Sequence, residues 1–337
     1  MTLIGIIASS KLTVAPTIDI AVAHASSPFI TAYPWSAGFG TKYADPATLP
    51  PSTGFMPAFR STTELALAHA SSPFVSVYAW GGSGFGSKYA NPASLPSSTS
   101  RAVKWQGTSD IANITDATPF VDAYAWSSGF GSKYANPATL PAGGGKDIAF
   151  NGSSDVAVGQ GSSPRVQAYP WSGSGFGTKY ADPATLPQGE GQGVAFAGGS
   201  FIAVASLNSP RIQAYPWTNG SGFGTKYADP ATLPTNAGRK VAFQGTSQIA
   251  VAHDVSPFVT AYPWSSGFGT KYADPATLPT GDARGLAFLS TTELAVAGEG
   301  SPFINVYAWS GSGFGSKYAN PATLPAADAQ GVAWKPL

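Results

Sequence analysis

One thirteen-residue stretch, Gly38–Pro50 (GFGTKYADPATLP), returns in nearly the same form six more times along the chain. A tryptophan stands ahead of each copy, at Trp35, Trp80, Trp126, Trp171, Trp217, Trp264 and Trp309. The steps between these tryptophans are 45, 46, 45, 46, 47 and 45 residues. Because a period of about 40–50 residues is typical of solenoids and propellers, the chain is predicted to be an array of seven similar units.

The pattern inside one unit, from Gly193 to Pro234, distinguishes between these architectures. The segment GVAFAGGSFIAVAS holds two short apolar runs joined by Gly-Gly-Ser, which indicates a tight hairpin. PRIQAYPW and FGTKYADP then alternate with the period of two that is typical of strands, and nothing has a helical period. Four short strands in each of seven units predict an all-β, seven-bladed β-propeller of four-stranded antiparallel blades.

The units are of two kinds. Those with Tyr-Pro-Trp continue with GTKYADP, and those with Tyr-Ala-Trp continue with GSKYANP. Contact between the changing positions and recent duplication of two parent units both explain this pairing, so it does not discriminate between them.

The ends of the chain predict how the ring closes. An apolar-x-aromatic motif marks the innermost strand of each blade, near Phe59, Trp105, Phe150, Phe196, Phe243, Phe288 and Trp334. The other strands begin at Ile18–His24, so the C-terminal GVAW is expected to complete the blade that comes first. The propeller domain is then 18–337, and 1–17 is a leader. Leu12–Ala15 is the competing closing strand, although Val14 takes its aromatic position.

The sequence of strands resembles the WD40 repeat, because an apolar VAF strand, a glycine turn, an apolar strand and an aromatic-ended strand follow in that order. The resemblance covers 12–334 and implies a seven-bladed ring. Tyr-Pro-Trp or Tyr-Ala-Trp replaces the family's Trp-Asp, and its Gly-His is missing, so the family's internal hydrogen bonds and functional residues are not carried over. The near-identity of the units also resembles propeller proteins of tailed bacteriophages, which implies a virion component.

Composition limits the partners and the compartment. The net charge is +1, so no field attracts nucleic acid or an anionic membrane, and neither is an expected partner. There is no cysteine, which excludes a disulfide framework and a cysteine metal site. The start MTLIGIIASSKL lacks a basic segment, and no apolar run approaches the ~20 residues of a membrane helix. Neither a signal peptide nor a membrane span is expected, and virion or cytoplasm is the expected location.

Aromatic and acidic residues are candidates for ligand-binding or catalytic sites. The seven tryptophans fit two interpretations: they join neighbouring blades, or they stack sugars in inter-blade pockets of a multivalent lectin. The chain has only four Glu, and no pair of carboxylates recurs among the units. With no nucleophile–base set, the chain is expected to be a non-enzymatic binding or structural module without a cofactor.

Lysines and histidines also recur at fixed places. One lysine on each predicted outer strand protects an exposed sheet edge from pairing; a basic ring that binds a ligand is the alternative. His24, His69 and His253 each stand eleven residues before a tryptophan. Equivalent positions on packed sheets lie about 10 Å apart or more, so these rings cannot share a zinc ion with bonds of about 2 Å. They are expected to face solvent or bond locally at a turn.

Loop variability points to one face. The loops that lead from the outer strand to the next innermost strand vary freely, as do those between second and third strands, and both are expected to meet at one mouth of the channel. Drift of loops is the competing explanation. Basic residues recur where innermost strands start, at Arg101, Lys146, Arg239 with Lys240, and Arg284. They are expected to surround the mouth of the channel, with His24, His69 and His253 further out on the same face. This mouth is predicted to bind a protein or glycan that is anionic or accepts hydrogen bonds. The chain itself is expected to be a monomer.

Overall fold

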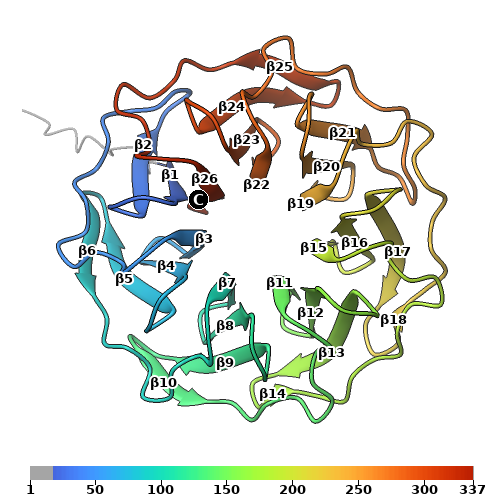
Figure 1. Cartoon of the computed structure of the whole chain (residues 1–337), viewed down its shortest axis with the longest axis horizontal. Helices are drawn as coiled ribbons and strands as arrows, with labels where there is room; N and C mark the ends of the chain where they lie inside the picture. The colour runs from blue at the N-terminus through green and yellow to red at the C-terminus, as the bar shows by residue number, and fades with distance from the viewer. Residues whose placement is uncertain (1–17, 337) are drawn as a thin grey trace, which may run out of the picture.

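The computed structural model describes residues 18–336, and these form seven sheets arranged in a ring around a central axis (Figure 1). Blades are numbered here along the chain from the one that holds β1. The innermost strands of blades one to seven are β26 (Ala329–Trp334), β3 (Gly54–Arg60), β7 (Ser100–Gln106), β11 (Gly145–Asn151), β15 (Gly191–Ala197), β19 (Gly238–Gln244) and β22 (Ala283–Leu289). The predicted seven-bladed all-β propeller is confirmed.

Two further strands in each blade pair antiparallel outward from the innermost one. The second strands are β1 (Ile18–His24), β4 (Glu64–His69), β8 (Asp110–Thr115), β12 (Asp155–Gln160), β16 (Phe201–Ser206), β20 (Gln248–His253) and β23 (Glu293–Gly298). The third strands are β2 (Ile30–Trp35), β5 (Val75–Gly81), β9 (Val121–Trp126), β13 (Val166–Ser172), β17 (Ile212–Thr218), β21 (Val259–Pro263) and β24 (Ile304–Ser310). Their apolar side chains are buried between neighbouring blades and form the core.

The length of the outer strand follows the two kinds of unit. The outer strands are β6 (Gly84–Lys88), β10 (Phe130–Lys133), β14 (Gly175–Phe176), β18 (Gly222–Phe223) and β25 (Gly313–Lys317), and blades one and six keep single bridges, Trp35–Phe39 and Trp264–Phe268. Only blades with Tyr-Ala-Trp extend the pairing as far as the lysine, as between Tyr78 and Lys88. Proline has no N–H to donate to a ladder, so Tyr-Pro-Trp shortens the outer strand.

The C-terminal strand closes the ring, as predicted. Strand β26 pairs antiparallel with β1, with Trp334 opposite Ile20 and Val332 opposite Val22, and Figure 1 shows the first and last described strands next to each other in one blade. Just beyond β26, the Lys335 ammonium lies 2.5 Å from Oδ2 of the buried Asp19. The competing closing strand, Leu12–Ala15, lies outside the described residues.

The tryptophan row joins neighbouring blades. Trp80 packs edge-to-face on Phe59 and Phe85 of its own blade, and on Tyr43 of the preceding blade, with ring centroids 5.0–5.5 Å apart. Equivalent contacts recur around the ring, and the seven row tryptophans are only 2–6% exposed. This confirms the blade-joining interpretation, because no indole face is open for a sugar to stack on.

Some tryptophans also take part in a polar contact between blades. Asp19 accepts hydrogen bonds from Tyr43 and from the indole N–H of Trp80, at 2.8 and 2.9 Å. Asp155 accepts in the same way from Tyr180 and Trp217. Within residues 18–336, four other indole N–H groups are buried without a partner: Trp35, Trp126, Trp171 and Trp264. An Asp-Tyr-Trp contact thus recurs at some of the blade interfaces but not at all of them.

Candidate channel-mouth binding site

The two variable sets of loops meet at one face. Ala70, after the second strand of blade two, donates its N–H to the carbonyl of Thr53, just before that blade's innermost strand. The same hydrogen bond joins Asp116 to Thr99 and Glu299 to Asp282. Because these bonds fasten each loop to the start of an innermost strand, the variable loops surround one mouth of the channel.

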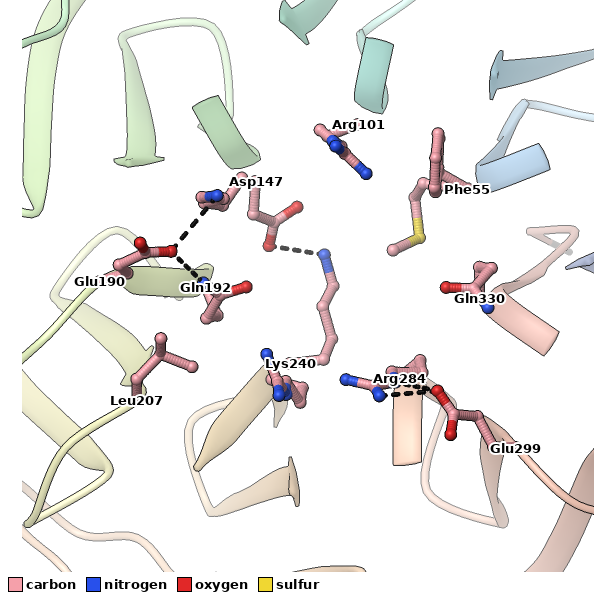
Figure 2. Close-up of a pocket in the computed structure, with 13 residues that line it drawn as sticks. Phe55, Arg101, Asp147, Glu190, Gln192, Leu207, Lys240, Arg284, Glu299 and Gln330 are labelled. Atoms are coloured by element: carbon pink, nitrogen blue, oxygen red, sulfur yellow. Dashed lines mark hydrogen bonds and ion pairs between the residues drawn. The ribbon is translucent and has the colours of Figure 1, made fainter. Parts of the chain in front are cut away.

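The second residues of all seven innermost strands line one cavity of about 400 Å³ at this mouth (Figure 2). Antiparallel pairing in every blade places these equivalent positions at the same height around the channel. They are Phe55, Arg101, Lys146, Gln192, Arg239, Arg284 and Gln330. We call this set the mouth ring. Of the five basic residues singled out in the sequence, Arg101, Lys146, Arg239 and Arg284 belong to the mouth ring, and Lys240 lines the same cavity one position further on, so the structure brings them together.

Each of these four cations has a carboxylate partner. The Arg101 guanidinium lies 2.7 Å from Asp116, and the Lys146 ammonium lies 3.3 Å from Glu190. Arg239 donates to Asp254 at 2.9 Å, and Arg284 to Glu299 at 2.6 Å. The mouth ring is therefore a set of ion pairs, and the predicted excess of positive charge at the mouth is largely neutralised.

The carboxylates follow a spacing that the sequence reasoning missed. Asp116, Asp254 and Glu299 each stand fifteen residues after the arginine that they bind. The start of an innermost strand lies beside the turn that follows the second strand. The chain between these two points consists of the innermost strand, a hairpin turn and the second strand, which together account for the fifteen residues. The repeated Arg-x14-Asp/Glu pattern was the signal that could have located these acids.

A cross-channel ion pair lies one residue deeper. Lys240, on β19 of blade six, extends across the channel, and its ammonium lies 2.5 Å from Oδ2 of Asp147 on β11 of blade four (Figure 2). The Val194 N–H of blade five donates to the same oxygen at 2.9 Å. The other oxygen, Oδ1, is buried and accepts no hydrogen bond from the described residues. This pair spans three blades and forms the floor of the mouth cavity.

Apolar side chains complete the mouth. Phe55 stands where other blades carry Arg, Lys or Gln, and the Arg101 guanidinium lies 4.7 Å from the centroid of its ring. Met56 and Leu207 also line the cavity. A cation over an aromatic face adds attraction and holds the guanidinium flat. The site thus offers hydrogen-bond donors, acceptors and apolar surface within one cavity.

The three histidines do not reach this surface. His24, His69 and His253 are fully buried at the ends of second strands, where each Nε2 is bonded to a hydroxyl of the third strand. Burial lowers the pKa of His24 and His69 to about 4 and also lowers that of His253. Their assignment to the ligand-binding face is corrected, because the imidazoles serve as neutral core groups that cross-link two strands. Among residues 18–336, no cluster of three His, Asp or Glu could hold a metal ion.

The outer lysines are also engaged. In five blades the ammonium pairs with a carboxylate: Lys42–Asp45, Lys133–Asp122, Lys179–Asp182, Lys226–Asp229 and Lys271–Asp274. Lys88 and Lys317 bond to the amides of Asn91 and Asn320 instead. Most of these lysines therefore stabilise the turn that follows, and a continuous basic ring is not formed.

Comparison with known proteins gives the fold and little beyond it. No family model and no curated protein match the chain. A crystal structure of a Lactobacillus plantarum protein has a TM-score of 0.70 at 13% identity, covering 94% of this chain and 99% of its own. A Bacteroides uniformis protein provisionally named a 6-phosphogluconolactonase has a TM-score of 0.68 at 12% identity, with 95% and 100% covered.

A third similar structure is the WD40 β-propeller domain of Doa1, which has a TM-score of 0.60 at 10% identity and covers 88% of this chain and 90% of that one. Together with the seven blades, it supports the WD40-like arrangement expected from the order of strands. At these identities the likeness shows the fold alone. The part of the chain that the structure describes has no helix able to cross a membrane.

Proposed function

We propose that this chain is a non-enzymatic binding module and that the mouth ring, with the loops around it, is its binding face. The observation that carries the proposal is a contrast within the innermost strands. Their second residues are of four types, Phe, Arg, Lys and Gln, whereas their sixth residues are Phe or Trp in every blade. Equivalent positions that differ chemically around one cavity, at the face where the variable loops also meet, support recognition there.

The chemistry of the mouth favours a protein loop or a glycan that presents hydrogen-bond acceptors. Each guanidinium has five N–H donors, and its carboxylate partner uses only some of them. Arg101 and Arg284 also keep part of their surface exposed. Because the carboxylates neutralise the field, affinity is expected to come from short-range hydrogen bonds and contact with Phe55, and not from long-range attraction.

Other functions have weaker support. The structure provisionally named a 6-phosphogluconolactonase is only 12% identical, so it shares the fold and carries no activity over. The titratable mouth-ring side chains are engaged in ion pairs, which does not favour acid–base chemistry. The lectin alternative required exposed tryptophans, and those are buried. A virion role remains part of the proposal on the phage resemblance alone, and the similar structures give it no support.

The test replaces charged mouth residues with a residue that the ring already contains. Gln192 and Gln330 occupy equivalent positions, so the triple variant R101Q/R239Q/R284Q changes the face with little effect on the strands. Labelled wild type and variant are compared on a glycan array and against a random peptide library. The matched control, K42Q/K226Q/K271Q, removes three cations from the outer edge.

The proposal expects ligands selected by the wild type to lose at least tenfold in affinity with the mouth variant and to keep it with the edge control. Equal binding by wild type and mouth variant would place the site elsewhere. Failure of the wild type to select any ligand from either library would also count against it.

A further inference from the structure

Below the Lys240–Asp147 pair, the channel continues as a second chamber, which we call the lumen. It consists of two adjoining cavities of about 270 and 330 Å³. Both are lined by Lys104, Trp105, Lys240, Leu286 and Ala287, so they are two halves of one space. The lumen adjoins the mouth cavity and shares Met56 and Lys240 with it, but neither half includes a mouth-ring residue.

One cation interrupts an otherwise uniform ring in the lumen. The fifth residue of the innermost strand is alanine in six blades and lysine in blade three. The alanines are Ala58, Ala149, Ala195, Ala242, Ala287 and Ala333. The ammonium of Lys104 makes no hydrogen bond or ion pair with any residue of 18–336. A long charged side chain therefore stands in a wall of methyl groups without a protein counter-ion.

The neighbouring charges leave the lumen positive. Lys240 also lines it, and the nearby carboxylate of Asp147 already accepts from that lysine and from the Val194 N–H. Two ammonium groups thus line the lumen, and the one carboxylate near them forms an ion pair with Lys240 alone. Burial and the charge of Lys240 lower the pKa of Lys104 to about 8, although Asp147 opposes the shift. A partly desolvated cation is stabilised when an anion comes within a few ångströms of it.

The rest of the wall is apolar. The aromatic sixth residues of the innermost strands line the two halves: Phe59, Trp105, Phe288 and Trp334 in one, Trp105, Phe150, Phe196 and Phe243 in the other. They are only half-buried, so they present ring surface to the channel. Cavities of about 300 Å³ or more with an apolar wall and a few polar groups are typical of small-molecule sites.

We propose that the lumen binds a small amphipathic anion, with an oxyanion head beside Lys104 and Lys240 and an apolar tail along the aromatic ring. The head is a carboxylate, a sulfate or a phosphate, because each presents oxygens that accept from two ammonium groups. The tail gains by leaving water for the alanine and aromatic wall. This site does not depend on the proposed function of the mouth.

The experiment measures binding of octyl compounds that share one tail and differ in the head. Octanoate, octyl sulfate and octyl phosphate are titrated by calorimetry, together with octylamine and octanol. Binding near Trp105 and Trp334 is followed in parallel by intrinsic fluorescence. The anions are expected to bind one per chain and at least tenfold more tightly than octanol or octylamine, and their order of affinity identifies the preferred head.

The chain supplies a benign variant, because K104A restores the alanine of the other six blades. The K104A variant is expected to melt cooperatively and to lose at least tenfold in affinity for the anions. K104R, which keeps the charge, and K226A, which removes a single lysine at the outer edge, are expected to retain binding. The mouth variant R101Q/R239Q/R284Q is also expected to retain it, which separates this site from the mouth. Equal binding of octylamine and octanoate, unchanged affinity in K104A, or no binding to the wild type would each overturn the proposal.

Discussion

The ammonium of Lys335 lies 2.5 Å from the carboxylate of Asp19, so a residue at the end of the described chain forms an ion pair with the first described strand. Both side chains are at least nine-tenths buried. The same carboxylate accepts from Tyr43 and from Trp80 of the next blade. Asp19 therefore links the closure of the ring to an interface between blades.

Replacing Lys335 with Met should destabilise the protein by about 3 kcal/mol, because Asp19 then keeps its charge in the interior without a cation. The double variant D19N/K335M removes both charges and should recover part of that loss. Chemical denaturation of the four proteins of this cycle measures the coupling. A coupling energy near zero would mean that the ion pair contributes nothing to closure.

Two tryptophans that pack alike differ in their hydrogen bonding, and this predicts different costs of substitution. W80F removes the donor to Asp19, whereas W171F removes an indole N–H that has no partner among the described residues. W80F should therefore cost about 1–3 kcal/mol more than W171F. Full truncation, as in W171A, should cost about 3–5 kcal/mol because the blade interface loses a buried ring. Urea melts decide both comparisons, and a W171A protein as stable as wild type would contradict the blade-joining role.

The buried histidines predict loss of stability in acid. Burial lowers the pKa of His24 and His69 to about 4 from 6.5, so between these values the unfolded chain binds more protons than the folded one. Stability must then fall as the pH falls from about 6.5 towards 4. Gln160 occupies the equivalent place in blade four, and the variant H24Q/H69Q/H253Q should flatten this slope. Thermal melting of the wild type and of this variant from pH 7 to pH 4 is the measurement. If the melting temperatures of both proteins fall in parallel with pH, the histidines are not the cause of the acid sensitivity.

Lys104 predicts a change of stability with pH at the alkaline end of the range. Its pKa is lowered to about 8 from 10.5, so between these values the unfolded chain holds the extra proton, and stability of the wild type rises with pH relative to K104A. The alanine variant should melt higher than wild type near pH 7, and the difference should shrink towards pH 10. NMR titration of the labelled lysine ammonium provides a direct reading, and a pKa near its ordinary value would contradict the lumen environment.

The repeat alone predicted the number of blades and the closing strand, and it offered inter-blade packing as one of two roles for the tryptophans. These features follow from period and pattern, which are properties of the linear chain. The partners of the mouth cations were missed because they depend on which turn lies beside which strand start, as for Arg101 and Asp116. For the histidines a local hydrogen bond was one of two expectations, and it is present. Their place on the ligand-binding face was wrong, because the hydroxyl seven residues later makes full burial possible.

Lys104 was overlooked for a different reason. Within its own strand it fits the alternation of polar and apolar residues, and only a comparison with the fifth residues of the other innermost strands shows that it is exceptional. Its meaning depends on closure of the ring, because closure turns seven separate positions into the wall of one chamber.

The pairing of β26 with β1 closes the ring without a covalent connection at that point, so the same ring could be built with the chain ends in another blade. In the other six blades a short turn joins the innermost strand to the second one, and in blade one the same place is left open between Lys335 and Ile18. A linker as short as those turns could bridge it, and any of the six turns could be opened in exchange. Residues 18–336 are therefore expected to accept circular permutation, in which any of the seven blades supplies the two ends.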